Sequence, residues 1–312
     1  MNAAGSFESR YVETEKVRLF CEAFGTPGDP FLLLIMGNSA PGLVWPDAFC
    51  TALAERGFYV VRFDQRDTGL SIFIDFDAAP YSLDTLAADA FAVLDAFGAR
   101  KAHIVGLSQG GGLAYRMALV APERVIDVVA VMTSPDLEPK NRAFAGLPPP
   151  DGELPRPGPD YVAAVIALNS VAPTDEQGLA DQFVENFRLA KGPRSPFDET
   201  AWATLGRKVA RQTMARTDGL TAKIANNSNH TRAQKATPSL TKEDLARITV
   251  PVLIVHGGGD PIFPVEHALW SRAAIPGAEL RVLDDMGHAL DPAFFGAIID
   301  LIAAFCDRPS AG

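Results

Sequence analysis

The sequence predicts an α/β fold with a mostly parallel, eight-stranded sheet, helices on both faces and a helical insertion after the sixth strand. The main observation is that short apolar runs rich in branched residues alternate with longer amphipathic segments. Nearly continuous apolarity is typical of strands buried on both faces of a parallel sheet, and the amphipathic segments suit the connecting helices. The second observation is that this alternation stops after about residue 133 and resumes at Val250.

The individual strands and helices can be placed from the same pattern. The stretch from Ser9 to Ala23 alternates in polarity and predicts an antiparallel hairpin at the edge of the sheet. Buried strands are expected at Phe31–Ile35, Tyr59–Phe63, Ala102–Leu107, Val125–Met132, Val250–Val255 and Ala278–Leu283. Helices are expected at about residues 44–56, 82–98, 109–121, 264–274 and 291–306.

The interruption of the pattern predicts the domain organisation. The interrupted stretch contains a loop rich in proline and glycine, at residues 147–159, followed by helical segments without strand character. Because strands on both sides are needed to complete one sheet, we expect a core of residues 1–133 and 242–312 and a helical cap of residues 134–241. Caps of this kind shape a substrate pocket and exclude water. A separate helical domain of unrelated purpose is the alternative.

The composition argues against several classes of function. Hydrophobic residues make up 47% and charged residues 21% of the 312 residues, as in globular proteins. The net charge of −10 argues against a nucleic-acid partner, and no apolar run approaches the roughly 20 residues that cross a bilayer. Residues 1–10 lack the basic and apolar regions of a signal peptide. We therefore expect a cytoplasmic protein without membrane association, and its oligomeric state stays open.

The cysteines do not predict a disulfide framework or a metal site. Cys21, Cys50 and Cys306 are odd in number, far apart and outside any C-x-x-C or Cys/His motif. Buried or half-buried free thiols are the expectation for such residues. No motif in the sequence calls for a metal or an organic cofactor.

The most informative motif is the pentapeptide Gly106–Gly110, which reads G-L-S-Q-G. It follows a predicted buried strand directly and opens a predicted helix, which is the context of a nucleophile elbow. A serine on such a sharp turn is held at strained backbone angles, and glycines two residues before and after it avoid collisions. We therefore expect Ser108 to be a nucleophile. The alternative is a glycine-rich turn in which the serine only caps the helix.

A serine hydroxyl needs a base, and histidine is the usual one. The chain has five histidines: His103, His230, His256, His267 and His288. His288 follows the last predicted strand and precedes the last helix, so it lies in a loop at the same sheet edge as Ser108. We expect His288 to be the base. His103 lies inside a strand, His230 in the predicted cap, His256 at a strand end, and His267 on a helix.

The third member of a triad is an acid that orients the imidazole and stabilises its protonated form. Asp260 comes just after the strand at Val250–Val255 and lies between the serine and the histidine in chain order. We therefore expect Asp260 to be the acid. Asp136, after the preceding strand, is the competing candidate because the acid can be carried one strand earlier.

The oxyanion of an acyl-transfer intermediate needs two preorganised donors. One is expected to be the backbone N–H of Gln109, the residue after the nucleophile. The other is expected from the loop after the strand at Phe31–Ile35, where the N–H of Asn38 is the best candidate. The Asn38 side chain is an additional donor or serves only to stabilise the turn.

These residues together resemble the α/β-hydrolase superfamily over nearly the whole chain apart from the cap. Residues 64–71 (DQRDTGLS) look like the D-x-R-G-x-G-x-S loop of that superfamily, with Asp67 where a glycine is usual. Met36–Gly37 stands where many members have His-Gly. With the W-P-D segment at Trp45–Asp47 and the segment Asp285–His288, these departures are similar to anthracycline methylesterases of the aclacinomycin methylesterase type.

This resemblance implies a serine carboxylesterase that hydrolyses small alkyl, methyl-type or short-acyl esters through an acyl-enzyme. It also implies a cap over a hydrophobic pocket. Candidate lining residues are Met36 and Leu107 from the core and Phe144, Leu147, Trp202 and Met214 from the cap. The same side chains could equally pack the cap onto the core.

Other chemistries fit the same three residues. Peptidase, lactonase, thioesterase and carbon–carbon bond hydrolase activities all use a Ser-His-Asp set, as does a cofactor-free perhydrolase. A non-catalytic ligand receptor on the same fold is a more distant alternative. Haloalkane dehalogenases and epoxide hydrolases use an aspartate at the elbow, whereas this chain has Ser108.

Overall fold

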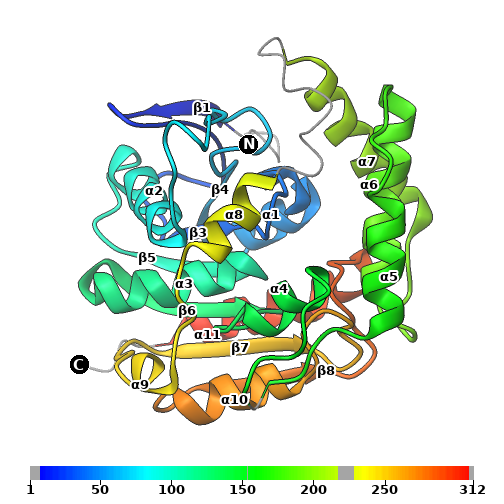
Figure 1. Ribbon diagram of the computed structural model, residues 1–312. Coiled ribbons are helices and arrows are strands. Elements are labelled where there is room, and N and C mark those ends of the chain that lie inside the picture. The colour runs from blue at the N-terminus through cyan, green and yellow to red at the C-terminus, as the bar shows by residue number, and fades with distance from the viewer. Residues whose placement is uncertain (1–7, 153, 217–227, 309–312) are drawn as a thin grey trace.

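A computed structural model describes residues 8–152, 154–216 and 228–308. It contains an eight-stranded sheet in the order β1-β2-β4-β3-β5-β6-β7-β8, in which β2 is antiparallel to β1 and β4 and the other pairs are parallel (Figure 1). The strands are β1 (Glu8–Glu13), β2 (Arg18–Phe24), β3 (Phe31–Ile35), β4 (Tyr59–Phe63), β5 (Ala102–Leu107), β6 (Val125–Val131), β7 (Val252–Gly257) and β8 (Glu279–Leu283). The predicted fold class is confirmed.

Helices cover both faces of the sheet because the buried strands are apolar on both sides. Leu33 of β3 faces a core that includes residues of α2, α3 and α10, while Leu32 and Leu34 face a core that includes α1 and α11. These helices are α1 (Asp47–Ala54), α2 (Leu83–Ala96), α3 (Gln109–Val120), α10 (Glu266–Ala274) and α11 (Phe295–Cys306). Short helices η1 (Gly42–Val44), η2 (Pro122–Arg124), α9 (Lys242–Leu245) and η4 (Pro292–Phe294) join the larger elements.

Three predicted parallel strands differ from the structure at their ends, and for β8 the difference is only that it begins at Glu279 rather than at Ala278. β6 ends at Val131 rather than at Met132, because Met132 has a φ of 47° and leaves the extended conformation. β7 begins at Val252 rather than at Val250, because Pro251 has no N–H for the ladder, and it continues to Gly257. The other central strands, β3, β4 and β5, match the predicted ranges.

The insertion between β6 and β7 is helical in the described part of the chain. Its helices are α4 (Glu138–Phe144), α5 (Pro159–Leu168), α6 (Glu176–Ala190), α7 (Glu199–Met214) and α8 (Ser228–Lys235). Figure 1 shows α5, α6 and α7 stacked together on one side of the molecule. In contrast, α8 contacts the core, where His230 is hydrogen-bonded to the Arg66 carbonyl and Gln234 to Gln109. The insertion therefore leaves the core and returns to it before β7.

An aromatic cluster joins the insertion to the core. Trp202 of α7 stacks on Phe197 and on Phe187 of α6, with ring centroids 5.4 Å and 4.5 Å away. Its indole N–H donates to Asp291 of the core at 3.0 Å. A buried indole with its N–H satisfied stabilises such a junction by both packing and hydrogen bonding. This arrangement holds α7 over the loop that carries His288.

The described residues contain no helix that is long and apolar enough to cross a membrane. Residues 1–7, which carry part of the expectation about a signal peptide, lie outside the described residues.

Candidate active site

Ser108 lies at a strained turn between β5 and α3. Its φ of 54° and ψ of −122° fall in a region that residues with a side chain rarely adopt. The backbone is held there by hydrogen bonds, since Ser108 N–H donates to the Val131 carbonyl at 2.8 Å and Thr133 Oγ1 donates to the Ser108 carbonyl at 2.6 Å. The turn therefore places the Ser108 hydroxyl beyond the carboxyl end of the strand.

The two glycines of the motif are there because nothing larger fits. A Cβ atom on Gly106 would overlap the Gly110 carbonyl, and one on Gly110 would overlap the Ile35 carbonyl of β3. The second contact shows how closely α3 approaches the neighbouring strand. Glycine at both positions is thus a steric requirement of the turn.

Asp260 and His288 form a short hydrogen-bonded pair at the same edge of the sheet. His288 Nδ1 lies 2.6 Å from Asp260 Oδ2, while Asp260 Oδ1 accepts from the N–H groups of Ile262 and Phe263 at 2.8 Å and 2.9 Å. Burial acts to raise the pKa of the Asp260 carboxyl, but the adjacent His288 ring and the hydrogen bonds outweigh it and lower this pKa. The carboxylate is therefore ionised and available to orient the ring.

Ser108 and His288 line the same cavity, of about 610 Å³. Because Nδ1 of His288 is engaged by Asp260, Nε2 is the ring nitrogen left for a partner in the cavity. Within the described ranges no hydrogen bond joins Ser108 to His288, and in free enzymes this contact commonly tightens only when substrate binds. The arrangement brings together the three residues that the sequence predicted as a triad.

Asp136, the competing candidate for the acid, and His267, another histidine, are hydrogen-bonded to other loops. Asp136 accepts hydrogen bonds from Ser239 Oγ at 2.5 Å and from the Glu138 N–H, and in the described part of the chain it has no hydrogen bond to Asp260 or His288. His267 contacts Ser134 Oγ at 2.7 Å and the Pro155 carbonyl at 2.9 Å. Both act as links between loops.

His256 lies close to the Asp260–His288 pair but is not hydrogen-bonded to Asp260. Its Nε2 contacts the Phe263 carbonyl at 2.8 Å and lies 3.9 Å from Asp260 Oδ2, while its buried Nδ1 has no partner among the described residues. Burial lowers the pKa of this ring and favours its neutral form.

The loop after β3 lies directly beside the nucleophile position. A Cβ atom on Gly37 would be 3.1 Å from the Ser108 Cβ, and the next residue, Asn38, lines the cavity. The N–H of Ser39 points elsewhere, since it donates to His230 Nδ1 at 3.0 Å. Gln109 begins α3, and the first N–H groups of a helix have no acceptor within it. Both predicted oxyanion donors therefore lie next to Ser108.

His230 is the residue that sequence reasoning underrated, because its position in the predicted cap gave no indication that it lies near the nucleophile. It is fully buried, its Nδ1 also lies 3.2 Å from Gln109 Nε2, and its Nε2 lies 2.8 Å from the Arg66 carbonyl. Burial lowers the pKa of the ring, so its neutral form connects the loops that carry Ser39 and Arg66 with Gln109. Histidine and glutamine four residues apart, at 230 and 234, were the available signal for a buried polar face.

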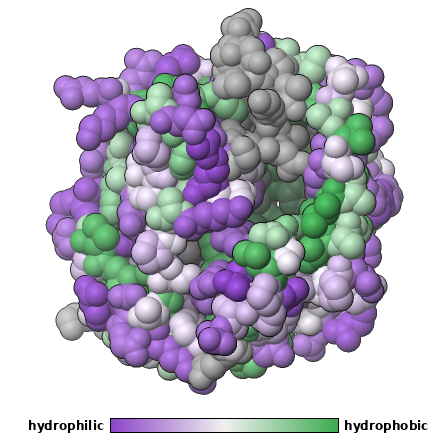
Figure 2. Space-filling model, in the orientation of Figure 1, coloured by the Kyte–Doolittle hydropathy of each residue, from purple (hydrophilic) through white to green (hydrophobic). Residues whose placement is uncertain are grey.

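The cavity runs from the sheet edge to the insertion helices. Of the predicted lining residues, Met36, Leu107 and Phe144 border it. Trp202 is buried in the aromatic cluster, Met214 ends α7 with 41% of its surface exposed, and Leu147 borders a neighbouring cavity instead. Figure 2 shows the surface hollowed between α8 and the insertion helices, with hydrophobic side chains along one rim. Apolar residues that the sequence did not point to complete the wall: Tyr161, Val165, Ile166, Phe183, Phe187, Val209 and Phe263.

Comparison with known proteins shows the family of this chain. A family model described as the alpha/beta hydrolase fold matches residues 30–290. The chain belongs to this family. Among relatives, it is 36% identical over 310 residues to the rhodomycin D methylesterase DauP of Streptomyces sp. (strain C5), covering 97% of this chain and 98% of that protein. It is 35% identical over 313 residues to the rhodomycin D methylesterase DnrP of Streptomyces peucetius, with the same coverage. The resemblance to anthracycline methylesterases is thus confirmed.

A solved α/β-hydrolase structure supports the fold. The 2-hydroxy-6-oxo-6-phenylhexa-2,4-dienoate hydrolase of Rhodococcus sp. strain RHA1 superimposes with a TM-score of 0.71, covering 96% of this chain and 99% of that chain. At 20% sequence identity this likeness concerns the fold alone.

The unusual aspartate of the α/β-hydrolase loop at residues 64–71 has a local explanation. Asp67 has a φ of 65°, the conformation for which glycine is favoured. Here its carboxylate accepts from the Ile74 N–H at 2.7 Å and from the Tyr81 hydroxyl at 2.5 Å. Aspartate tolerates the left-handed region better than most residues, and these two bonds stabilise it there.

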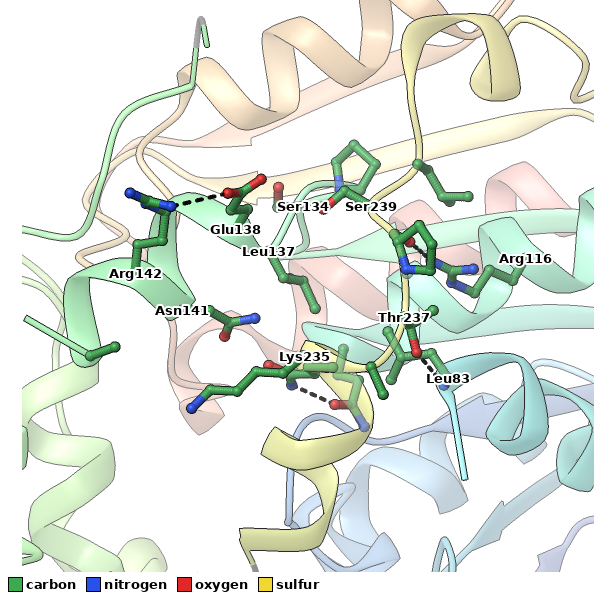
Figure 3. Close-up of a pocket in the computed structure, with 18 of the residues that line it drawn as sticks. Leu83, Arg116, Ser134, Leu137, Glu138, Asn141, Arg142, Lys235, Thr237 and Ser239 are labelled. Atoms are coloured by element: carbon green, nitrogen blue, oxygen red, sulfur yellow. Dashed lines mark hydrogen bonds and ion pairs between the residues drawn. The ribbon is translucent and has the colours of Figure 1, made fainter. Parts of the chain in front are cut away.

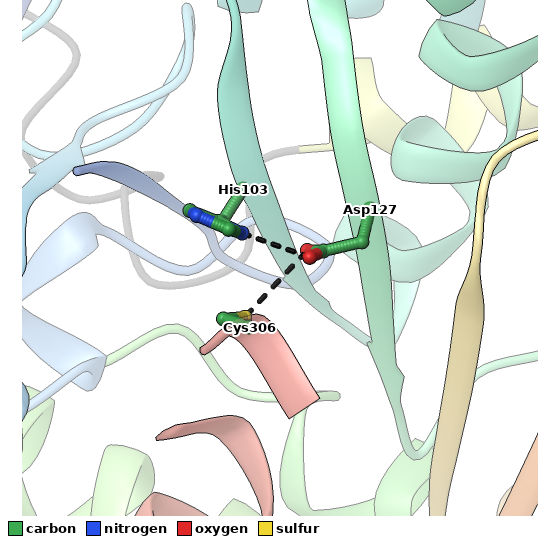
Figure 4. A group of neighbouring side chains, drawn as sticks. All are labelled: His103, Asp127 and Cys306. Carbon is green, nitrogen blue, oxygen red and sulfur yellow. Dashed lines mark hydrogen bonds and ion pairs between the residues drawn. The ribbon is translucent and has the colours of Figure 1, made fainter. Parts of the chain in front are cut away.

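Among the described residues, one cluster of potential metal ligands lies near the amino ends of the central strands β5 and β6. His103, Asp127 and Cys306 have ligand atoms within 4.8 Å of one another, and all three are buried (Figure 4). Asp127 receives hydrogen bonds from both neighbours, with Oδ2 2.8 Å from His103 Nδ1 and Oδ1 3.5 Å from Cys306 Sγ. These bonds satisfy the three groups among themselves, as expected of a buried structural cluster.

Proposed function

We propose that this protein is a serine carboxylesterase that hydrolyses a methyl or other small alkyl ester of a bulky, largely hydrophobic acid. The proposal rests mainly on one observation: the Asp260–His288 pair faces the cavity into which the strained turn at Ser108 opens. A nucleophile, a base and an orienting acid at one sheet edge constitute the machinery of acyl transfer.

In this proposal Ser108 attacks the ester carbonyl while His288 Nε2 accepts the hydroxyl proton. Asp260 holds the ring through Nδ1 and stabilises the imidazolium that forms. The tetrahedral intermediate collapses, His288 returns the proton to the departing alkoxide, and an alcohol leaves. Water, activated by the same ring, then releases the acid from the acyl-enzyme.

The N–H groups of Gln109 and Asn38 stabilise the oxyanion. His230 supports this assignment because it engages the competing N–H of Ser39. Residues 134–241 act as the cap over the core of residues 1–133 and 242–312, with α4, α5, α6 and α7 walling the cavity. A walled cavity strengthens each of these electrostatic interactions by excluding water.

The substrate class follows from the relatives and from the cavity. The two rhodomycin D methylesterases act, by their names, on a methyl ester. A cavity of about 610 Å³ bordered mainly by aromatic and aliphatic side chains accommodates a polycyclic or similarly large acyl group. We therefore assign the bulk of the substrate to the acyl side and the small group to the alcohol side.

A fluorophosphonate probe and an ester panel test the proposal. The wild-type protein should be labelled at Ser108, and Ser108→Ala should not be labelled. Methyl esters of naphthoic acids should be hydrolysed faster than a matched aminoacyl anilide. Faster turnover of the anilide would indicate a peptidase, and a wild-type protein that is neither labelled nor active would indicate a non-catalytic receptor.

A further inference from the structure

The cavity that contains Ser108 has an unbalanced charge. Two lysines, Lys140 of α4 and Lys235 of α8, border it. No aspartate or glutamate is among the described residues that line it. In an otherwise mainly apolar pocket, two cations without a facing carboxylate create a positive potential at the place where substrate binds.

Lys140 has only one hydrogen-bond partner in the described part of the chain. Its ammonium donates to Gln234 Oε1 at 2.8 Å, and this acceptor is neutral. An ammonium group has three donors, and leaving charged donors unpaired in a partly buried position is costly. Burial lowers the pKa of Lys140 to about 8, so the group is still mainly protonated at neutral pH. A lysine held in this way suits an acceptor that arrives with the ligand.

The same glutamine connects Lys140 to the reaction centre. Gln234 Nε2 lies 2.9 Å from Asn38 Oδ1 and 2.5 Å from Gln109 Oε1, the side chains of the two proposed oxyanion residues. Lys140 is thus connected through one residue to the side chains of Asn38 and Gln109, and it lines the same cavity as Ser108.

A second cavity lies next to the first and is bordered by some of the same polar residues. This second cavity, of about 560 Å³, shares Asn141 and Lys235 with the first (Figure 3). Figure 3 shows both residues on one side of it, with Arg116 on the other side. Arg116 is already paired with Asp84 at 2.7 Å and with the Pro238 carbonyl. Among the described residues that line the two cavities, Lys140 and Lys235 are therefore the cations without a carboxylate partner, and they lie on α4 and α8.

We propose that Lys140, with Lys235 and Asn141 beside it, forms a subsite for an anionic oxygen on the acyl part of the ester. The inference rests on the proposed esterase function and narrows its substrate: the acid carries, besides the reacting ester, a carboxylate or an acidic phenol. The apolar wall binds the carbon skeleton, while the ammonium binds the oxygen and orients the ester toward Ser108. A charge-assisted hydrogen bond of this kind contributes more than a neutral one.

Matched pairs of esters test the subsite. The half-methyl esters of aliphatic and naphthalene dicarboxylic acids of increasing length should be compared with the corresponding dimethyl esters. Methyl hydroxynaphthoates should be compared with their methoxy counterparts, so that the two pairs separate a carboxylate ligand from a phenol. For each pair the measured quantity is the ratio of kcat/KM for the acidic ester to kcat/KM for the neutral one, in wild type, Lys140→Met, Lys140→Arg and the exposed control Lys16→Met.

The wild type should prefer at least one acidic ester over its neutral partner. Lys140→Met should lower that ratio by about tenfold or more, the loss expected for one charge-assisted hydrogen bond. Lys140→Arg should retain most of the ratio, and Lys16→Met should not change it. An absence of preference in the wild type, or an equal loss for both members of each pair in Lys140→Met, would overturn the subsite and make Lys140 a support for Gln234.

A binding measurement separates this inference from the esterase proposal. Calorimetry of Ser108→Ala with a naphthalenedicarboxylate half ester should show binding that the Ser108→Ala/Lys140→Met double variant loses. If the wild type hydrolyses no ester, the proposed function fails, but this difference in affinity still supports the anionic subsite. Equal affinity in the two variants would overturn the subsite even if the wild type is an esterase.

Discussion

Two buried histidine–aspartate pairs are hydrogen-bonded in the described part of the chain, and they have the same chemistry but different positions on the sheet. His288–Asp260 and His103–Asp127 both join Nδ1 to a carboxylate, at 2.6 Å and 2.8 Å. The first lies at the carboxyl ends of the strands and borders the large cavity. The second lies inside the sheet, at the start of β5 and β6, with Cys306 against the carboxylate and the edge of Phe58 near the ring.

The difference shows that position on the sheet, and not the pair itself, decides whether a site can form. Strands and helices that alternate along the chain leave the carboxyl edge open to loops, so a side chain there can reach a cavity. Side chains inside the strands are covered on both faces by helices. An imidazole held at the correct tautomer can take part in proton transfer only where a nucleophile and a substrate can approach it.

The largest expected effect is the loss of kcat when the residues around the cavity are changed. Ser108→Ala and His288→Ala should each reduce kcat for a methyl ester by about four to six orders of magnitude, and the double variant should lose little more, because the groups act as a unit. Circular dichroism should show that the variants are folded. Additive losses would contradict a shared step.

The second largest effect is expected from substitution of the proposed acid, Asp260. Asp260→Asn should reduce kcat by about three to four orders of magnitude, because an amide cannot hold the ring in the required tautomer. Asp136→Asn is the matched control and should stay near wild-type activity, since the partners of this carboxylate among the described residues are Ser239 and the Glu138 N–H. If Asp136→Asn inactivates the protein and Asp260→Asn does not, the assignment of the acid is wrong.

The preference for acidic esters should depend on pH, because a titratable lysine lines the cavity. Substrate cannot approach the buried His103–Asp127 pair in the same way. The pKa of Lys140 is lowered by burial to about 8, so its charge is present below that pH and is lost above it. The other titratable groups that line the cavity are Tyr161, Lys235 and His288. Between pH 7 and 9 the preference for a half-methyl ester, whose carboxylate stays ionised, over its dimethyl ester should fall about fivefold to tenfold. Lys140→Arg should abolish this pH dependence, and its persistence there would assign it to another group.

The smallest expected effect on activity concerns the buried His103–Asp127 pair. Asp127→Asn should leave kcat per folded molecule within about twofold of wild type, because no substrate reaches this cluster. It should nevertheless lower the free energy of unfolding by about 1 to 3 kcal/mol, the usual cost of disturbing a buried hydrogen-bond network. Urea unfolding and ester hydrolysis measured on the same preparation check both statements. A large loss of kcat without a loss of stability would show that the two regions are coupled.

Much of this protein can be predicted from its sequence because the relevant signals are local. Buried strands such as β3 and β5 are continuous apolar runs, and Gly106 and Gly110 are imposed by the steric requirements of one turn. Chain order and the positions of strand ends were sufficient to select Ser108, Asp260 and His288 as residues that meet at one edge. The resemblance to anthracycline methylesterases also rests on short motifs.

Only the tertiary structure decided which side chains of the insertion reach the cavity. Trp202 and Phe144 are both aromatic residues on insertion helices, yet Trp202 is buried against Phe197 while Phe144 borders the cavity. His230 and Lys140 gain their roles from contacts with loops far away in sequence, through Ser39 and Gln234. Such contacts depend on how helices pack across long separations in the chain, and hydrophobic periodicity within one segment carries no information about them. For that reason the sequence by itself determined which edge of the sheet carries Ser108, Asp260 and His288. Only the tertiary structure decided which side chains surround them.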